Sequence, residues 1–351
     1  MKGCVYLWFI ANKDPKSLKS SLSFQSFIGN ARVVRILRRA IEQERLPHAL
    51  IFAGPEGVGK RTLGLLLAQH LNCLQPTNGE MCNQCGSCRK IMGGNHPDVR
   101  VIEPEGAYIK IDQLRALIDE IAYQPFEGRY RVAILNGADK MRPEASNCLL
   151  KTLEEPPSRS FLILVTDKPY LLLGTIRSRS RKLQFGGISE NELEVFLTRR
   201  EKRSPEDARL AAVLSNGSIG AALAFDAAAT REIRRLAFRF VSMLLRRERF
   251  TQASALIAGV VKEKDSFRIW VEMTATLLQD IYYAQVSPER MGQRDMLEEL
   301  NGIARSAPHS SVVSAIEGVK ELKAGLLRNV NRQVAVEALF LKERAGGTST
   351  P

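Results

Sequence analysis

Four cysteines carry the clearest chemical pattern in the sequence. Cys73, Cys82, Cys85 and Cys88 follow one another with the spacing C-x8-C-x2-C-x2-C. Four thiolates at such spacing suit a tetrahedral Zn²⁺ ion, and an ion bound by four thiolates has no open position for a substrate. We therefore predict a structural zinc site in a small module over residues 73–88. A redox-active C-x2-C pair and unrelated free thiols are the alternatives.

A glycine-rich loop forms the second pattern. Residues 54–60 read Gly-Pro-Glu-Gly-Val-Gly-Lys, which fits the phosphate-loop pattern G-x-x-x-x-G-K. Gly54, Gly57 and Gly59 allow backbone N–H groups to surround phosphate oxygens, and Lys60 is placed to reach the β- and γ-phosphates. The pattern predicts a phosphate loop but leaves open whether ATP or ADP still binds there.

The first residue that would hold Mg²⁺ next to this loop is missing. The pattern requires Ser or Thr after the lysine, but Arg61 stands there and Thr62 follows one position late. One residue turns a helix by about 100°, so Thr62 should point away from the phosphates.

The second metal-binding position is changed as well. A phosphate-loop ATPase carries an acidic residue at the end of a neighbouring strand, where it holds Mg²⁺. The strand expected at 130–135 is followed instead by Asn136 and Gly137, and Asp139 comes three residues too late. We therefore predict that this chain does not hydrolyse ATP at its own site; the alternative is an ATPase in its own right.

The apolar pattern around these motifs predicts an α/β domain. Strands are expected at 48–53, 99–102, 131–135 and 161–166, with helices at 31–44, 61–71, 111–122 and 143–154. The order of strand, loop and helix at residues 48–71 is the context that a phosphate loop requires.

The remainder of the chain is expected to be helical. Short helices are predicted at 190–200 and 205–214, long helices from about 226, a looser connection at 284–310 and a final helix pair at 311–342. The resulting boundaries are a flexible extension at 1–22, the α/β domain at 23–186, a small helical domain at 187–225, an all-α domain at 226–345 and a disordered tail at 346–351.

The charge of the chain narrows the class of partner. Lys and Arg number 51 against 38 Asp and Glu, a formal net charge of +13, and a chain this basic favours a nucleic acid as partner. No apolar run approaches the length of a transmembrane helix. The short apolar segment near the start lacks the small-residue cleavage site of a signal peptide. We therefore expect a cytoplasmic protein with reduced thiols and no membrane partner.

Several stretches resemble one family. They are Leu46-Pro-His-Ala-Leu50, Asn95-His-Pro-Asp98, Cys148-Leu-Leu-Lys-Thr-Leu-Glu-Glu-Pro-Pro157, Ile176-Arg-Ser-Arg179 and Asn329-Val-Asn331 with the helix after it. Together they look like the bacterial DNA polymerase III clamp loader subunits, which are AAA+ proteins, over residues 24–345. The resemblance implies an AAA+ P-loop domain with a zinc insert, a helical lid at 187–225 and an all-α collar that oligomerises at 226–345.

The family contains an ATP-hydrolysing type, gamma/tau, and a non-motor type, delta-prime. This sequence departs from the gamma/tau pattern at Arg61, at Asn136-Gly137 and at Gly220, which stands where an arginine would touch the γ-phosphate. The departures resemble the delta-prime type. A gamma/tau-like ATPase is one alternative, and a zinc-dependent DNA-binding protein that belongs to no loader is another. The resemblance implies gamma/tau and delta subunits as partners, with the sliding clamp and primer-template DNA reached through the complex.

One catalytic motif of the family is kept. Ser178-Arg179-Ser180 resembles its Ser-Arg-Cys motif, whose arginine is a finger inserted into a neighbouring subunit's ATP site. A guanidinium supplied in trans stabilises the charge on a transferring phosphoryl group. The resemblance assigns this role to Arg179; an ordinary surface arginine is the alternative. Thr166 resembles the sensor-1 position of the same family.

Overall fold

The computed structural model describes residues 23–345 except 78, 294–295 and 327–329. It divides into two compact units, one up to Ala224 and one from Phe225 onward. The expected extension at 1–22, the tail at 346–351 and Asn329 lie outside the described residues.

A parallel five-stranded sheet organises the first unit. Its strands are β1 (Ala49–Ala53), β2 (Val99–Ile102), β3 (Arg131–Asn136), β4 (Ser160–Thr166) and β5 (Arg181–Gln184), in the order β2-β3-β4-β1-β5. Each neighbouring pair runs parallel, so the carboxyl ends of all five strands meet at one edge of the sheet. The predicted strands are confirmed, while β5 was not predicted.

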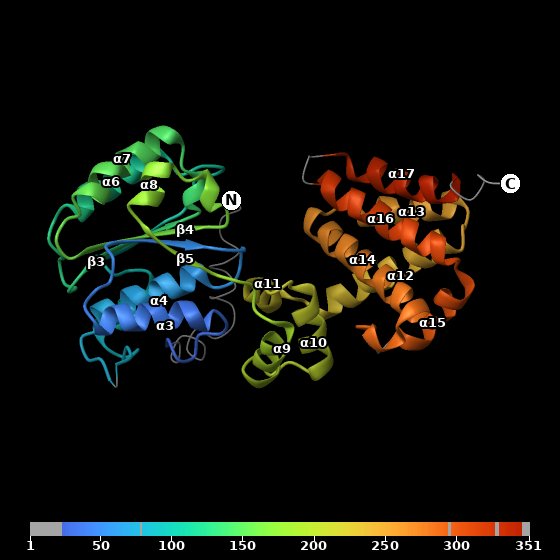
Figure 1. Cartoon of the computed structure of the whole chain (residues 1–351), viewed down its shortest axis with the longest axis horizontal. Coiled ribbons are helices and arrows are strands. Elements are labelled where there is room, and N and C mark those ends of the chain that lie inside the picture. The colour runs from blue at the N-terminus through green and yellow to red at the C-terminus, as the bar shows by residue number, and fades with distance from the viewer. Residues whose placement is uncertain (1–22, 78, 294–295, 327–329, 346–351) are drawn as a thin grey trace. The chain divides into compact units, whose positions relative to one another are not determined.

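Helices cover both faces of this sheet and make three layers (Figure 1). Side chains of the central strands alternate between two apolar clusters: Leu50 and Phe52 belong to one, and Ala49, Ile51 and Ala53 to the other. Both clusters are apolar because a central parallel strand is buried on its two faces, which explains the continuous apolar runs in the sequence.

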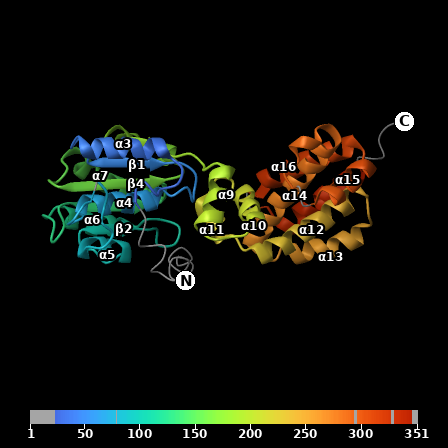
Figure 2. The ribbon, with the colours of Figure 1, turned by 90° about the horizontal axis from the view of Figure 1, so that it is seen from below.

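The helices of the first unit match the predicted order. They are α3 (Ala31–Glu42), α4 (Lys60–Asn72), α5 (Gly86–Gly93), α6 (Ile111–Ile121), α7 (Pro143–Glu154), α8 (Gly174–Ser178), α9 (Glu190–Arg199), α10 (Pro205–Leu214) and α11 (Ile219–Ala224), with short 3-10 turns η1 (Ala138–Lys140) and η2 (Pro169–Leu171). The sequence did not predict α5, α8 or α11. Helix α5 packs beside α4 (Figure 2).

The second unit is entirely helical in its described residues. Its elements are α12 (Ala227–Leu245), α13 (Phe250–Val260), α14 (Lys264–Val286), η3 (Pro288–Arg290), α15 (Leu297–Ser306), α16 (His309–Leu326) and α17 (Arg332–Ala345). Phe240, Phe267, Trp270 and Phe340 are fully buried and form its aromatic centre. The prediction of a looser connection at 284–310 is partly wrong, because α15 lies within it and buries Leu300, Ile303 and Ala304.

A membrane span is absent from the described part of the chain, where no helix combines the necessary length with an apolar composition.

Candidate metal and nucleotide sites

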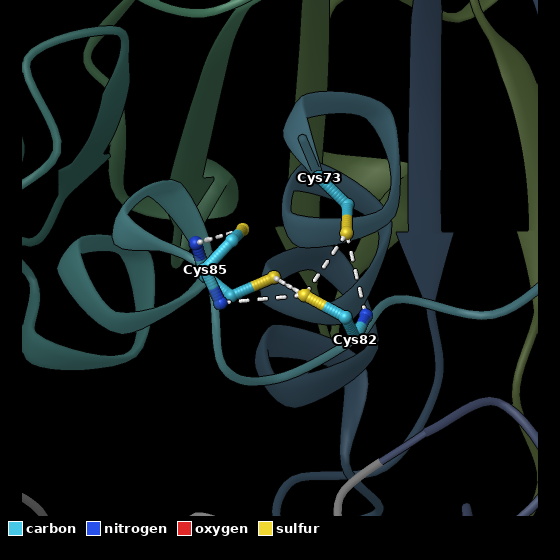
Figure 3. Close-up of side chains that lie close together, drawn as sticks. Cys73, Cys82 and Cys85 are labelled. Atoms are coloured by element: carbon cyan, nitrogen blue, oxygen red, sulfur yellow. Dashed lines mark hydrogen bonds between the residues drawn. The ribbon is translucent and has the colours of Figure 1, made fainter. Parts of the chain in front are cut away.

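The four cysteines of the predicted zinc module converge on one point. Their Sγ atoms all lie within 4.8 Å of one another, and Figure 3 shows the sulfurs of Cys73 and Cys82 pointing toward each other. Cys73 and Cys82 are 3.5 Å apart, and Cys82 and Cys88 are 3.9 Å apart. Four sulfurs at about 2.3 Å from a tetrahedral ion are about 3.8 Å from one another. The donor set and its spacing therefore fit a metal ion bound by four thiolates.

The local backbone explains why the sulfurs converge. Cys73 directly follows α4, and Cys85 caps the first turn of α5, which contains Cys88. The backbone N–H of Cys82 donates to the sulfur of Cys73 at 3.3 Å, that of Cys85 to Cys82 at 3.3 Å, and that of Cys88 to Cys85 at 3.4 Å. Asn83 adopts a left-handed conformation with φ 58°, which makes the tight turn. Backbone N–H groups that donate to ligand sulfurs in this way orient the metal ligands and stabilise their negative charge.

The electrostatics of the cluster differ from one thiol to the next. Burial raises the pKa of Cys73 and Cys88. Burial would also raise the pKa of Cys82, but N–H donors from Gln84 and Cys85 outweigh it and lower the pKa to about 6. A metal ion binds thiolates, so its binding here would release the protons of the buried thiols.

The cysteine module is joined to the core of the first unit. Cys73, Met81, Cys88 and Ile91 belong to the apolar cluster that lies on one face of the sheet. A metal ion in this module would therefore stabilise the packing of α5 against α4 and not merely an exposed loop.

The glycine-rich loop connects β1 to α4 as predicted. Gly54, Gly57 and Gly59 have φ of 153°, 76° and 92°, values that favour glycine because a Cβ would be strained there. Lys60 is buried, and its Nζ donates to the carbonyl oxygens of Gly54 and Pro55, both at 2.6 Å. Burial lowers the pKa of Lys60, against opposing attraction from Asp167 and other acids. The lysine is thus folded onto its own loop.

Arg61 and Asn136 stand where the two Mg²⁺ ligands are missing, and both contact one carboxylate of the chain. The Nε of Arg61 lies 3.3 Å from Oε1 of Glu103, and the side-chain amide of Asn136 donates to the same oxygen at 3.3 Å. Glu103 follows β2 directly, and Asn136 ends the neighbouring strand β3. The Glu103 carboxylate is therefore shared between the Arg61 guanidinium and the amide N–H₂ of Asn136, and neither of these nitrogen donors can bind Mg²⁺. Thr62 is exposed.

Asp139 and Thr166 meet at the same edge of the sheet. The hydroxyl of Thr166 donates to Oδ1 of Asp139 at 2.7 Å and accepts from the backbone N–H of Lys168 at 3.0 Å. Because both of its hydrogen-bonding roles are used, the Thr166 side chain is committed to the protein itself.

Residues of the chain itself also cover the glycine-rich loop. The N–H of Gly220, in α11, donates to the carbonyl oxygen of Gly57 at 3.0 Å. A Cβ added to Gly57 would lie 2.0 Å from the hydroxyl oxygen of Ser218, and one added to Gly59 would lie 2.9 Å from the ring of Phe27. These glycines are therefore required for close contact within the chain, whether or not a phosphate binds.

Arg179 is held in an ordered conformation at the end of α8. Its Nη2 lies 2.8 Å from Oε1 of Glu154, the last residue of α7. Its Nη1 donates to the carbonyl oxygen of Thr175 at 3.2 Å and to the hydroxyl of Ser178 at 3.3 Å. The side chain is 37% exposed, which is open enough for contact with another subunit.

The Asn95-His-Pro-Asp98 stretch has a structural role. The buried carboxylate of Asp98 accepts from the backbone N–H groups of residues 126–128 at 2.7, 2.9 and 2.7 Å and lies 3.6 Å from Nε of Arg131. His96 accepts from the N–H of Asp98 and contacts Ser87 in α5. Burial by itself would raise the pKa of Asp98, but these donors outweigh it and the pKa is lowered.

Asp98→Asn is expected to lower the free energy of unfolding by about 3 kcal/mol, because the amide nitrogen would face backbone donors in a buried site. In the wild type, a lowered pKa stabilises the fold above the ordinary pKa of about 3.9, and this contribution disappears as pH falls through the folded-state value. Urea unfolding at pH 7 and pH 3 measures both effects. The variant should lose less stability than the wild type on acidification, and an equal loss in the two proteins would contradict the assignment.

The structure pairs the singled-out residues with partners that the sequence analysis did not name. Glu103 beside Arg61 and Glu154 beside Arg179 are the important ones. Glu103 offered a usable signal, since an acid directly after β2 must lie near the end of β3 in a parallel sheet. Glu154 lies within the Cys148–Pro157 stretch, and no feature of the sequence indicated its contact with Arg179.

Comparison with known proteins identifies relatives over nearly the whole chain. The family model described as "DNA polymerase III, delta subunit" matches residues 29–189. The delta-prime subunit of DNA polymerase III from Bacillus subtilis is 32% identical over 318 residues, covering 90% of this chain and 96% of that protein. The corresponding subunit from Pseudomonas aeruginosa is 30% identical over 302 residues, covering 84% and 91%.

Relatives of the tau/gamma type are matched over a smaller share of their own length. The tau subunit from Escherichia coli is 28% identical over 352 residues, which are 92% of this chain but 54% of that protein. The tau/gamma subunit from Haemophilus influenzae is 31% identical over 175 residues, which are 50% of this chain and 25% of that protein. The delta-prime relatives, in contrast, are matched over most of both chains. The protein therefore belongs to the delta-prime family of DNA polymerase III subunits.

Proposed function

We propose that this chain is the non-motor subunit of a clamp loader, which helps to load the sliding clamp on primed DNA without hydrolysing ATP itself. In this proposal it assembles with gamma/tau and delta subunits in the cytoplasm, and residues 187–225 and 226–345 act as lid and oligomerising collar. The cysteine module holds a structural Zn²⁺, and Arg179 is supplied to the ATP site of an adjacent gamma/tau subunit.

The observation that carries the proposal is the cluster of Arg61, Glu103 and Asn136. Phosphate-loop hydrolysis requires a metal-binding hydroxyl on the loop and a carboxylate at the end of the adjacent strand. Arg61 and Asn136 stand at these two positions and share the carboxylate of Glu103. The lysine of the loop is turned onto Gly54 and Pro55. The site supports a structural loop better than a hydrolytic centre.

The purified chain alone is expected to show no ATP turnover above that of its Lys60→Ala variant. When it is mixed with the gamma/tau and delta subunits of the same bacterium, the chain should form a stable complex. Primed DNA should stimulate ATP hydrolysis by that complex. Size-exclusion chromatography and a phosphate-release assay measure the two properties. Turnover by the isolated chain that Lys60→Ala abolishes would establish the gamma/tau-like alternative instead.

A further inference from the structure

The stability of helix α7 does not explain why Glu154 stands at its end and forms an ion pair with Arg179. Glu154 is the last residue of α7. The basic residue in the last turn of that helix is Lys151, which stands three positions before Glu154. A carboxylate at a helix C-terminus is opposed by the helix dipole. Its closest described cation is Arg179, whose Nη2 lies 2.8 Å away. The Glu154 carboxylate therefore stabilises the guanidinium of Arg179, directly after α8, and not the helix that contains Glu154.

This arrangement occupies the donors that a phosphoryl group would need. One ion pair, from Nη2 to Glu154, and two hydrogen bonds, from Nη1 to Thr175 and Ser178, engage both terminal nitrogens of Arg179. A guanidinium binds a phosphate best through two parallel N–H groups, and a carboxylate beside it neutralises the charge that makes it effective. A carboxylate carried into a nucleotide site would also repel the phosphates. Full engagement of Arg179 with a phosphate therefore requires release from Glu154.

We infer that Glu154 acts as a carboxylate latch. In the free subunit its ion pair holds Arg179 back, and the pair breaks when Arg179 binds phosphate oxygens in the assembled ATP site of a neighbouring subunit. The inference rests on the proposed role of Arg179 and adds to it a residue that regulates the finger. Glu154 touches neither nucleotide nor phosphate, so it is a positioning residue. The exchange of one anion for another involves no covalent step.

The test uses the reconstituted complex containing wild-type chain or Glu154→Gln, which removes the charge and keeps the shape. The variant is expected to raise the kcat of ATP hydrolysis without DNA by about two- to fivefold, the size that a partly exposed ion pair supports. The KM for ATP and the assembly of the complex should not change, because Glu154 does not contact nucleotide. A smaller stimulation by primed DNA should accompany the higher basal rate.

Glu155→Gln is the matched control, since Glu155 is exposed at the same helix end and no ion pair is described for it. It should behave as wild type. A double-mutant cycle with Arg179→Ala shows whether Glu154 acts through the finger. The combined variant should equal Arg179→Ala alone.

The outcomes separate the latch from the finger. If Arg179→Ala lowers hydrolysis while Glu154→Gln leaves kcat unchanged or lowers it, the latch is wrong and the finger stands. If Glu154→Gln raises kcat equally in the Arg179→Ala background, Glu154 acts by another route and the latch is again wrong. If Arg179→Ala changes nothing, the finger fails and the latch fails with it.

Discussion

Replacing Arg179 by alanine in the assembled complex is expected to slow ATP hydrolysis at the adjoining subunit's site by about 10³-fold, the lower end of the effect of an arginine finger. The reason is electrostatic, because a planar guanidinium supplied in trans meets the charge that develops on the transferring phosphoryl group. Arg179 is partly exposed directly after α8, so a neighbouring subunit can reach its guanidinium.

Single-turnover hydrolysis in the complex measures this effect, since the other ATP sites would mask part of it at steady state. Arg177→Ala is the matched control, because Arg177 is exposed on the same short helix and carries the same charge. Arg179→Lys should fall between alanine and wild type, since it keeps the charge but loses the planar fork. Equal losses for Arg177→Ala and Arg179→Ala would indicate a general loss of positive surface charge rather than a finger.

Replacing Cys85 by serine is expected to remove the bound metal and to destabilise the first unit. Structural zinc supplies about 10–16 kcal/mol of binding free energy in zinc-dependent peptides, and a variant that loses the ion loses the part of it that stabilises the fold, which we expect to be at least about 3 kcal/mol. The loss should spread to α5 and α4, because Cys73 and Cys88 are part of the apolar cluster against the sheet. Metal analysis of protein purified without chelator, together with thermal unfolding, measures both consequences.

Cys148→Ser provides the control for this experiment. Cys148 lies in α7, away from the four-cysteine cluster, and its thiol donates to the carbonyl oxygen of Glu144. It should retain the full metal content and nearly the full melting temperature. A chelator should lower the melting temperature of wild type and of Cys148→Ser but not that of Cys85→Ser. Wild-type protein that contains no zinc would remove the metal assignment.

The central strands of the sheet were predictable because each is buried on two faces and reads as a continuous apolar run. Strand β5 was missed because it lies at the edge of the sheet and buries only Leu183. Helix α15 was missed because its buried residues are few among polar neighbours, and packing within the second unit, more than its local pattern, holds it in place.

The two chemical motifs were visible for a different reason. The four cysteines and the glycine-rich loop are contiguous segments, and their spacing alone restricts what their side chains can do. The absence of a hydroxyl at residue 61 and of a carboxylate at residue 136 could likewise be seen residue by residue.

The partners of these residues depend on the fold. Asp139 and Thr166 are 27 residues apart and meet because β3 and β4 are parallel neighbours. Glu103 reaches Asn136 for the same kind of reason, through the pairing of β2 with β3. Local spacing thus specified the type of chemistry that each segment carries. Which partners the charged side chains of Arg61 and Arg179 have is decided by sheet order and helix packing, because these bring residues that are distant in the sequence within hydrogen-bonding distance.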